Sequence, residues 1–329
     1  MSNLVLVTGA DGLLGSNLVR ELLEQGFSAR VLVQPGSRSP TLQGLPVEMV
    51  TGDLLGQDDA LKDAARGCDA IFHCAAITNL WARPELVFKV NVEGTRKVLE
   101  LVFAQKIKRL IFVGSASSFQ FGSLQNPGDE RGSFPAEYRG MTYMESKHQA
   151  LRLVREYVSA KGLDAVMVIP TFMLGRYDYG PSSGELLRQF IRRRMKFVSP
   201  GGRNFVYVRD VAKAMVSALD RGRKGEFYIL AGENLSYLDF FSKAAKIAGI
   251  APPQFQLPGA LVRLAGLGGS LYGKIAGRAV QLNSRMARLA CLCTYYSAKK
   301  ARQELGMPQS PIEQAIEESL QSLRDYGHI

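Results

Sequence analysis

Short apolar runs alternate with longer segments of helical periodicity over the first half of the chain. The apolar runs predict β-strands at residues 4–7, 29–33, 47–51, 70–74, 110–113 and 165–169. The segments between them predict α-helices at residues 13–25, 58–65, 84–105 and 143–161. Because the strand runs lack alternating polar residues, each strand should be buried on both faces. The pattern therefore predicts an α/β fold, a doubly wound parallel sheet of the Rossmann type covered by helices.

The alternation weakens after Pro170. A Gly- and Pro-rich stretch at 175–184 precedes a basic helix near 185–194, and a helix at 208–221 and a strand at 226–230 should rejoin the sheet. Beyond these, the pattern predicts a helix from 236 to Gly249, a Gly-rich apolar segment at 257–282 and a last helix near 312–326. We therefore expect a first domain of residues 1–172 plus 204–232, and a smaller, partly interleaved C-terminal domain of residues 173–203 plus 233–329.

The formal net charge of +11 is spread unevenly along the 329 residues. No Asp or Glu occurs between Asp239 and Glu304, and a shorter basic cluster covers residues 188–196. The acid-free interval contains Lys243, Lys246, Arg263, Lys274, Arg278, Arg285, Arg288, Lys299, Lys300 and Arg302. Such a distribution favours anionic substrates or acidic lipid surfaces, or is a solvated face. Nucleic acid is not expected, because the chain has no helix-turn-helix, zinc knuckle or basic ribbon with interleaved aromatic residues.

No apolar run reaches the roughly 18 to 20 residues that span a bilayer, and the N-terminus lacks a signal-peptide pattern. The four cysteines show no paired framework and no ligand set for a metal, so we expect reduced thiols, no metal and a cytoplasmic protein. These cysteines are Cys68, Cys74, Cys291 and Cys293. The apolar segment 257–282 leaves membrane-surface contact open beside ordinary helix packing.

A glycine-spaced loop lies directly between the first predicted strand and the first predicted helix. In the run Thr8-Gly9-Ala10-Asp11-Gly12-Leu13-Leu14-Gly15, the first glycine permits a tight turn and the third permits close packing of helix on sheet. The middle glycine lets backbone N–H groups approach a pyrophosphate at the positive end of the helix dipole. The predicted dinucleotide contacts are Thr8, Gly9, Asp11, Gly12, Leu13, Leu14 and Gly15.

The segment after the second strand predicts which dinucleotide is bound. NAD-selective folds place an acid about 20 residues after the glycines, where it accepts hydrogen bonds from the ribose 2′-hydroxyl. Here no acid occurs until residue 48, whereas Gln34, Ser37 and Arg38 would suit a 2′-phosphate. We therefore expect NADP, with NAD left open because Arg38 could instead face solvent. Asp53 and Leu54, after the third strand, are candidate adenine contacts, although Asp53 could instead cap the following loop.

Two side chains that suit proton transfer lie one turn apart on the predicted helix 143–161. Tyr143 and Lys147 occupy positions i and i+4 and therefore share one face. A free phenol titrates near pH 10, and an ammonium about 5 Å away would lower its pKa by roughly two units. Ser115, at the carboxyl end of strand 110–113, can donate a hydrogen bond to a substrate oxygen. With the glycine loop, these residues predict hydride transfer with Tyr143 as the proton donor.

Together these motifs resemble the extended short-chain dehydrogenase/reductases of the NAD(P)-dependent epimerase/dehydratase superfamily. The resemblance covers nearly the whole chain and is carried by the glycine loop, Gly52-Asp53-Leu54, Phe72-His73-Cys74-Ala75-Ala76, Asn91-Val92-Glu93-Gly94-Thr95, Ser115, Tyr143, Lys147 and Ile169-Pro170-Thr171. Residues 207–212, 232–235 and 296–301 are similar to the dihydroflavonol-reductase-like and 3β-hydroxysteroid-dehydrogenase-like branch.

The resemblance implies a catalytic triad of Ser115, Tyr143 and Lys147, in which Lys147 also holds the nicotinamide ribose. It places Asn91 in a helix that supports the site. It also implies cofactor contacts from Ala75, Ala76 and Pro170, the last beside the nicotinamide amide.

The chain departs from the family pattern at two positions. Gly114 stands where serine is common, and Gln34 stands where this branch often has a basic residue, so the expectation of NADP depends on Arg38. His73 ends an apolar strand and is left without a catalytic role, because such a histidine is more often structural. His148 follows Lys147 in the sequence but should point away from its face.

These observations favour an NADP-dependent reductase that acts on a ketone or aldehyde of a mostly apolar small molecule, or oxidises the alcohol. Residues 1–172 plus 204–232 would bind the cofactor, and the second domain would bind the substrate. Two alternatives remain: an NAD-dependent nucleotide-sugar epimerase using Arg192–Arg194 or Arg209 on a diphosphate, and a non-catalytic NADP-sensing scaffold. A 4,6-dehydratase is disfavoured, because Ala116-Ser117 stands where those enzymes have Asp-Glu. A homodimer is left open.

Overall fold

The computed structural model describes residues 3–56, 58–277, 280 and 283–329. Its largest sheet has seven strands in the order β10-β6-β5-β4-β1-β2-β3, and every neighbouring pair is parallel. Its strands are β1 (Leu4–Thr8), β2 (Ser28–Val33), β3 (Glu48–Thr51), β4 (Ala70–His73), β5 (Arg109–Val113), β6 (Ala165–Pro170) and β10 (Phe227–Leu230). The strand order reverses at β1, and folds of this kind bind ligands beyond the carboxyl ends of the strands at such a reversal.

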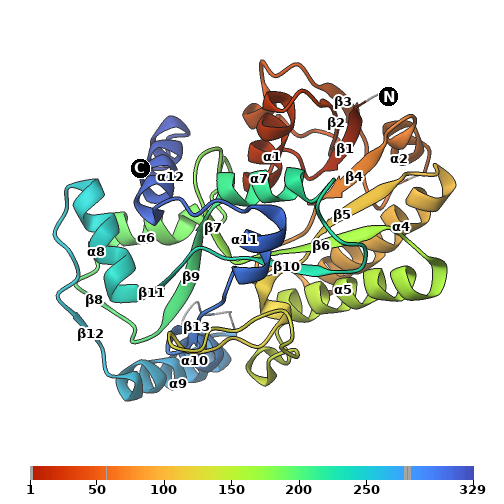
Figure 1. Ribbon diagram of the computed structural model, residues 1–329. Helices are drawn as coiled ribbons and strands as arrows, with labels where there is room; N and C mark the ends of the chain where they lie inside the picture. The colour runs from red at the N-terminus through yellow and green to blue at the C-terminus, as the bar shows by residue number, and fades with distance from the viewer. Residues whose placement is uncertain (1–2, 57, 278–279, 281–282) are drawn as a thin grey trace.

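Helices cover both faces of this sheet (Figure 1). On one face α1 (Leu13–Glu24) packs against α7 (Val208–Ser217). On the other face α4 (Gly94–Ala104) packs against α2 (Asp58–Ala65) and α5 (Thr142–Lys161). The predicted α/β fold with a doubly wound parallel sheet is confirmed.

The helix predicted over 84–105 is present but changes its winding midway. It begins as α3 (Pro84–Phe88), widens into a π-helical turn, η2 (Lys89–Glu93), and continues as α4. Single π-turns of this kind often occur at functional sites. Here the turn carries Asn91, whose buried side chain contributes to the site described below.

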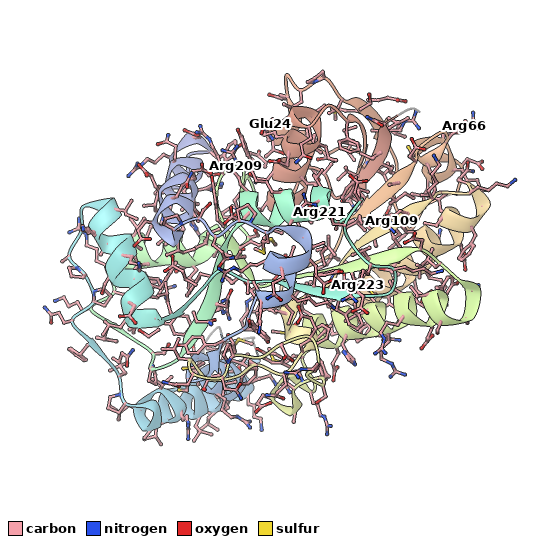
Figure 2. All side chains as sticks on the ribbon, viewed as in Figure 1. Glu24, Arg66, Arg109, Arg209, Arg221 and Arg223 are labelled. Atoms are coloured by element: carbon pink, nitrogen blue, oxygen red, sulfur yellow. The ribbon has the colours of Figure 1, made fainter. Side chains whose placement is uncertain are left out.

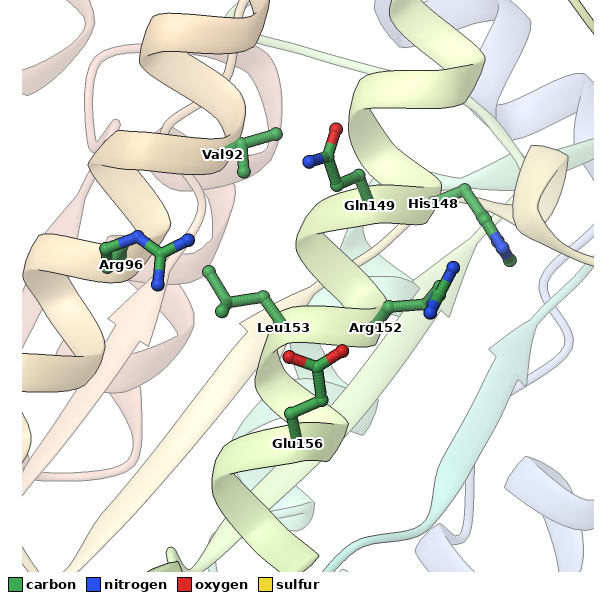
Figure 3. A pocket seen from close by; sticks show the side chains of 7 residues that line it. All are labelled: Val92, Arg96, His148, Gln149, Arg152, Leu153 and Glu156. Atoms are coloured by element: carbon green, nitrogen blue, oxygen red, sulfur yellow. The ribbon is translucent and has the colours of Figure 1, made fainter. Parts of the chain in front are cut away.

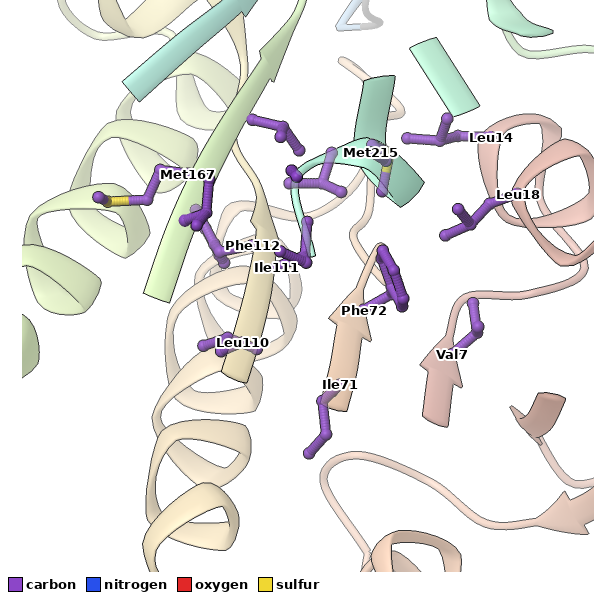
Figure 4. Close-up of a cluster of buried hydrophobic side chains, with 14 of the residues drawn as sticks. Val7, Leu14, Leu18, Ile71, Phe72, Leu110, Ile111, Phe112, Met167 and Met215 are labelled. Carbon is purple, nitrogen blue, oxygen red and sulfur yellow. The ribbon is translucent and has the colours of Figure 1, made fainter. Parts of the chain in front are cut away.

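The main core lies between the seven-stranded sheet and its helices, and Figure 4 shows part of it. Val7, Phe72 and Phe112 come from three adjacent strands and are completely buried. Leu18 of α1 and Met215 of α7 belong to the same cluster. Burial of continuous apolar strands on both faces holds their carboxyl ends in a fixed order, and the candidate site lies along that edge.

A second, smaller sheet was not predicted from the sequence. Its strands are β7 (Phe172–Leu174), β9 (Gly202–Tyr207), β11 (Glu233–Ser236) and β13 (Cys293–Thr294). Strand β9 pairs with each of the other three. A second core lies against this sheet under α6 (Gly184–Arg193), α8 (Tyr237–Ala248) and α12 (Ile312–Asp325). At its centre the rings of Phe205 and Phe240 stack with centroids 3.9 Å apart.

The remaining elements are short apart from one helix. They are β8 (Phe197–Val198), β12 (Phe255–Gln256), α9 (Gly259–Ala276), α10 (Ser284–Ala290), α11 (Lys299–Leu305), η1 (Pro40–Leu42), η3 (Ala116–Ser118) and η4 (Ala136–Tyr138). Helix α9 forms within the apolar segment predicted at 257–282, whose Arg278 and Leu282 lie outside the described residues. Among the helices in the described ranges, none combines the length and apolar character needed to cross a bilayer.

Candidate active site

Two of the three loop glycines are required by the packing of the chain itself. Gly9 has a φ of 66°, and a Cβ added to it would lie 2.7 Å from the Cα of Ala75, just beyond β4. A Cβ on Gly15 would lie 2.1 Å from the carbonyl oxygen of Gly9. Both clashes involve backbone atoms, which cannot move without displacing the turn or α1.

Gly12 has a different environment. A Cβ added there would contact the carbonyl oxygen of Gly9 at 3.6 Å and no other protein atom within 4 Å. Gly12 is also the N-cap of α1, and no side chain caps the first turn. Since the first N–H groups of a helix have no intrahelical partners, this uncapped end fits the pyrophosphate of a dinucleotide. Leu13 and Leu14, which begin the helix, are buried.

The loop after β2 is tied to the glycine loop by hydrogen bonds. Ser37 and Ser39 donate from Oγ to the carboxylate of Asp11 at 2.8 and 3.1 Å. Gln34, Ser37 and Arg38 are exposed. An acid is therefore present beside this loop, although it comes from the glycine loop rather than from the end of β2. The sequence pattern at the end of β2 therefore gives no sign of this carboxylate, which belongs to Asp11.

The residues after β3 play a local structural part. Asp53 is exposed and accepts a hydrogen bond through Oδ1 from the backbone N–H of Leu55 at 2.9 Å, so it caps the loop that follows β3. Leu54 is buried and belongs to the main core. Without a ligand, Asp53 therefore caps the loop after β3, which is one of the two roles expected from the sequence.

Tyr143 and Ser115 meet although they are distant in the sequence. Ser115 lies two residues beyond the end of β5 and caps η3, accepting a hydrogen bond from the N–H of Ser117 at 3.3 Å. Tyr143 lies in the first turn of α5, close enough to Ser115 for the serine hydroxyl to lower the pKa of the phenol. Burial raises the pKa of Tyr143 above its ordinary value, and the effect of Ser115 offsets this only in part. The phenol is therefore protonated at neutral pH.

Lys147 is buried on the next turn of α5. Its Nζ donates to the carbonyl oxygen of Val113 at 2.6 Å and lies 5.2 Å from the ring centroid of Phe112. Burial lowers the pKa of Lys147 to about 8. The expected lowering of the Tyr143 pKa by this ammonium is wrong for the protein alone, because burial of the phenol raises that pKa and the neighbour that lowers it is Ser115 rather than Lys147.

Asn91 joins the π-helical turn to both neighbouring parts of the site. Its Oδ1 accepts from the N–H of Ile77 at 2.8 Å, and its Nδ2 donates to the carbonyl oxygen of Ile77 at 3.1 Å. The same Nδ2 donates to Oγ of Ser146 at 2.9 Å, and Ser146 donates to the carbonyl oxygen of Tyr143 at 2.8 Å. Asn91 therefore fixes the start of α5 against the segment after β4.

His73 belongs to a buried polar chain that the sequence did not reveal. Its Nδ1 lies 2.8 Å from Oγ1 of Thr8, and its Nε2 lies 3.1 Å from Oγ1 of Thr95. Because Thr95 donates its hydroxyl proton to the carbonyl oxygen of Asn91, it must accept from Nε2–H of the histidine. Burial, aided by the positive charge of Lys147, lowers the pKa of His73 to about 3. The histidine is thus neutral and structural.

The other expected cofactor residues lie along the same edge of the sheet. Thr8 ends β1 and is fully buried, with its hydroxyl used by His73. Ala75 and Ala76 follow β4 and are half-buried, and Pro170 ends β6 and is buried. The sheet therefore brings the ends of β1, β4, β5 and β6 together, and with them most of the predicted site.

A groove of about 330 Å³ lies elsewhere, between η2–α4 and α5 (Figure 3). Its lining residues are Val92, Arg96, His148, Gln149, Arg152, Leu153 and Glu156. It contains none of Ser115, Tyr143 and Lys147. His148 lines this groove and contacts Phe134 with the ring planes tilted by 32° and the ring centroids 4.5 Å apart, so it points away from the face of Lys147.

Arg209, a candidate diphosphate ligand, lies beside Glu24 (Figure 2). The two side chains form an ion pair at 3.9 Å. Glu24 is the last residue of α1, which is about 18 Å long at 1.5 Å per residue. Arg209 is therefore placed at the end of α1 remote from the glycine loop.

Comparison with known proteins gives the family. The model of the NAD dependent epimerase/dehydratase family matches residues 5–231. A Synechocystis sp. protein whose name assigns it provisionally as a dihydroflavonol 4-reductase is 33% identical over 100% of this chain and 97% of its own length. The 4-hydroxy-2-methyl-3-oxo-4-farnesyl-3,4-dihydroquinoline-1-oxide ketoreductase of Stigmatella aurantiaca is 30% identical over 98% of this chain and 96% of its own.

A solved structure gives the same result over the full length. The crystal structure of gox2253 is 31% identical, covers 99% of both chains and has a TM-score of 0.88. The chain therefore belongs to the NAD dependent epimerase/dehydratase family and is an NAD(P)-dependent enzyme of the extended short-chain dehydrogenase/reductase type.

Proposed function

We propose that the protein is an NADP-dependent reductase that converts a ketone or aldehyde of a mostly apolar small molecule to the alcohol. The observation that carries this proposal is that Tyr143 lies close to Ser115 just beyond the carboxyl end of β5, with Lys147 buried one turn further along α5. The names of similar proteins support an apolar substrate. They include a 3-beta-hydroxysteroid dehydrogenase of Mycolicibacterium neoaurum, 28% identical over 96% of this chain.

The three side chains divide the chemistry of carbonyl reduction. Tyr143 carries a proton at neutral pH, as a phenol does, and the raised pKa keeps it protonated until it donates that proton to the substrate oxygen. Ser115 donates a second hydrogen bond to the same oxygen and stabilises the negative charge that develops there. Lys147 holds the nicotinamide ribose. The bound coenzyme supplies the hydride.

The coenzyme would lie along the carboxyl edge of the sheet. The uncapped start of α1 at Gly12 would hold the pyrophosphate, and Ala75, Ala76 and Pro170 would line the nicotinamide half. NADP is favoured over NAD because Arg38 is exposed in the loop after β2, where it would reach a 2′-phosphate, and β2 ends without an acid. The carboxylate of Asp11 already accepts from Ser37 and Ser39, which limits its part in selecting NAD.

The two cores support a division into a cofactor-binding part and a substrate-binding part. The main core joins β1–β6, α7 and β10, whereas the second core joins β7, β9, α6, α8 and α12. Substrate would then bind between the edge of the large sheet and the segments of the second core.

A nucleotide-sugar epimerase is the second candidate, favoured by likeness to a structure of that description. A nucleoside-diphosphate-sugar epimerase from Pseudomonas aeruginosa is 25% identical over 99% of this chain, with a TM-score of 0.80. The ion pair of Arg209 with Glu24 removes one of the expected diphosphate ligands. An epimerase should keep NAD bound through gel filtration, whereas a reductase should exchange NADPH freely.

The test is turnover of NADPH and NADH with a panel of apolar ketones and aldehydes. We expect reduction of at least one panel member, with a higher kcat/KM for NADPH. The matched variant Arg38→Gln should weaken NADPH and leave NADH nearly unchanged, because it removes a charge that only the 2′-phosphate would use. Binding of NADPH without any turnover of the panel, or of sugar nucleotides, would instead favour a sensing role.

A further inference from the structure

Helix α9 exposes a row of large apolar side chains. Six of them are between 51% and 78% accessible: Leu261, Leu264, Leu267, Leu271, Tyr272 and Ile275. The helix lies at the lower edge of the molecule in Figure 1, clear of both sheets. Single exposed apolar residues are ordinary, but a contiguous row on one helix marks a surface that another phase or molecule covers.

The row is confined to one side of the helix. At about 100° per residue, its six members span an arc of about 140°. The opposite side contains Val262 and Gly266, which are buried. A Cβ added to Gly266 would lie 2.3 Å from the Cβ of Ala287 in α10, so α9 already packs closely through its small residues. Helix α9 therefore packs on the rest of the protein through the side opposite the exposed row.

The surroundings of the row carry positive charge. Arg263 and Lys274 are exposed and flank the row on one side, and α10 adds Arg285 and Arg288. Acidic residues are absent from the whole interval between Asp239 and Glu304. Phe255, just before α9, is also half exposed and stacks on Phe197 at 6.1 Å. Apolar side chains flanked by basic ones are typical of helices that bind a membrane with an apolar interior and anionic headgroups.

We propose that α9 is an interfacial helix that lies on the surface of an anionic lipid bilayer. Its 18 residues make a cylinder about 27 Å long, which lies in the plane of the membrane with the leucine row among the acyl chains. Arg263 and Lys274 then meet the lipid phosphates. A second copy of this chain fits less well, because a symmetric contact would bring two acid-free, cationic helices together.

The lipid-facing surface is joined to the candidate active site. α9 packs on α10, and Arg285 of α10 donates from Nη1 to the carbonyl oxygen of Gly140 at 2.5 Å. Gly140 lies two residues before α5, whose first turn carries Tyr143. If the proposed function is correct, membrane binding through α9 brings the active site close to the lipid bilayer, in which an apolar substrate dissolves. Lipid binding itself does not depend on that function.

The proposal is tested by flotation of the full-length protein with vesicles. The vesicles contain either phosphatidylcholine alone or phosphatidylcholine mixed with phosphatidylglycerol, at low and high salt. We expect wild-type protein to prefer the anionic vesicles by about tenfold or more, with the preference falling as salt screens the charges. The double variant Leu264→Ser/Leu271→Ser should lose at least about tenfold in vesicle binding, because two apolar side chains no longer enter the bilayer.

Matched variants separate the row from general effects. Leu86→Ser/Leu124→Ser removes two exposed leucines elsewhere and should leave vesicle binding unchanged. Arg263→Gln/Lys274→Gln should reduce the preference for anionic vesicles, because Arg285 and Arg288 remain. Circular dichroism would verify folding of every variant. The proposal is overturned if folded wild-type protein ignores anionic vesicles, or if the Leu264/Leu271 variant floats as wild type does. It is equally overturned if that variant only converts a dimer to a monomer in sedimentation.

Discussion

The carboxyl edge of the seven-stranded sheet and the outer face of α9 depart from ordinary burial in opposite directions. At the sheet edge, polar groups such as Lys147, His73 and Asn91 are buried and hydrogen-bonded. On α9, large leucines are exposed in a row. Exposing large apolar side chains costs free energy in a monomer, and so does burying a charge such as that of Lys147, whereas His73 and Asn91 offset the cost of burial by hydrogen bonds. We propose that a dinucleotide and a carbonyl bind at the sheet edge and that lipid covers α9.

The largest expected effect on stability is at Lys147, whose buried charge should destabilise the fold while serving catalysis. Lys147→Met should lower turnover at least about a hundredfold and weaken coenzyme binding. The same variant should be more stable than wild type by up to about 3 kcal/mol at pH 7, since a pKa of about 8 replaces the ordinary 10.5. Steady-state kinetics and denaturant unfolding measure the two effects.

The pH dependence of that stability difference follows from the direction of the shift. A folded-state pKa below the unfolded value means that the unfolded chain binds more protons between the two values. The cost of burying Lys147 is therefore complete below pH 8 and disappears as the pH rises toward 10.5. Unfolding curves of Lys147→Met and wild type should converge over this window. A constant difference would show that the charge of Lys147 is not the cause.

The glycine loop gives the next largest effect and a sharp control. Gly15→Ala places a Cβ 2.1 Å from a backbone oxygen and should cost about 1–3 kcal/mol of unfolding free energy. Gly12→Ala meets protein only at 3.6 Å and should cost less than about 1 kcal/mol. Both should nevertheless weaken coenzyme binding at least about tenfold, measured by fluorescence titration. Unchanged coenzyme affinity in Gly12→Ala would contradict the proposal that this loop binds the pyrophosphate.

Asn91 tests whether the buried polar groups act through the position of Tyr143. Asn91→Ala leaves Ile77 and Ser146 without their partners and should cost about 1–3 kcal/mol of stability. Because Ser146 holds the carbonyl of Tyr143, kcat should fall more than coenzyme affinity does. Ser117→Ala, which removes a hydroxyl 2.8 Å from Oγ of Ser115, is the matched control and should change kcat less.

The sheet edge and α9 also differ in how much of their structure the sequence predicts. The glycine loop and the pair Tyr143–Lys147 are recognisable because each needs particular residue types at a fixed spacing within one strand–helix unit. The long apolar strands likewise predict the large sheet, since their burial is a property of each run alone. The acid-free apolar segment 257–282 was visible too, but its exposure was not, because exposure depends on what the rest of the chain covers.

Features that depend on distant contacts could not be predicted. The second sheet pairs strands of two to six residues from four separate parts of the chain, which give no periodic pattern. The link from Asp11 to Ser37 and the chain through His73 both join different loops and elements. The raised pKa of Tyr143 was also missed, because burial of the phenol is set by tertiary packing.

The smallest expected effect is on the stability of the α9 variants. Leu264→Ser/Leu271→Ser should change the unfolding free energy by less than about 0.5 kcal/mol, since both side chains are mostly exposed. Thermal or denaturant unfolding without lipid measures this. A loss of several kcal/mol would mean that the row stabilises the folded chain, and the comparison with the sheet edge would no longer hold.

The central proposal is that Tyr143 delivers a proton to a substrate oxygen, while Ser115 donates a hydrogen bond to the same oxygen and Lys147 holds the nicotinamide ribose. The most direct measurement is kcat for Tyr143→Phe beside its coenzyme dissociation constant, with a substrate that wild-type protein turns over. The account predicts a fall in kcat of about 10²- to 10⁴-fold with coenzyme binding nearly unchanged. A Tyr143→Phe enzyme that keeps most of its turnover would contradict it.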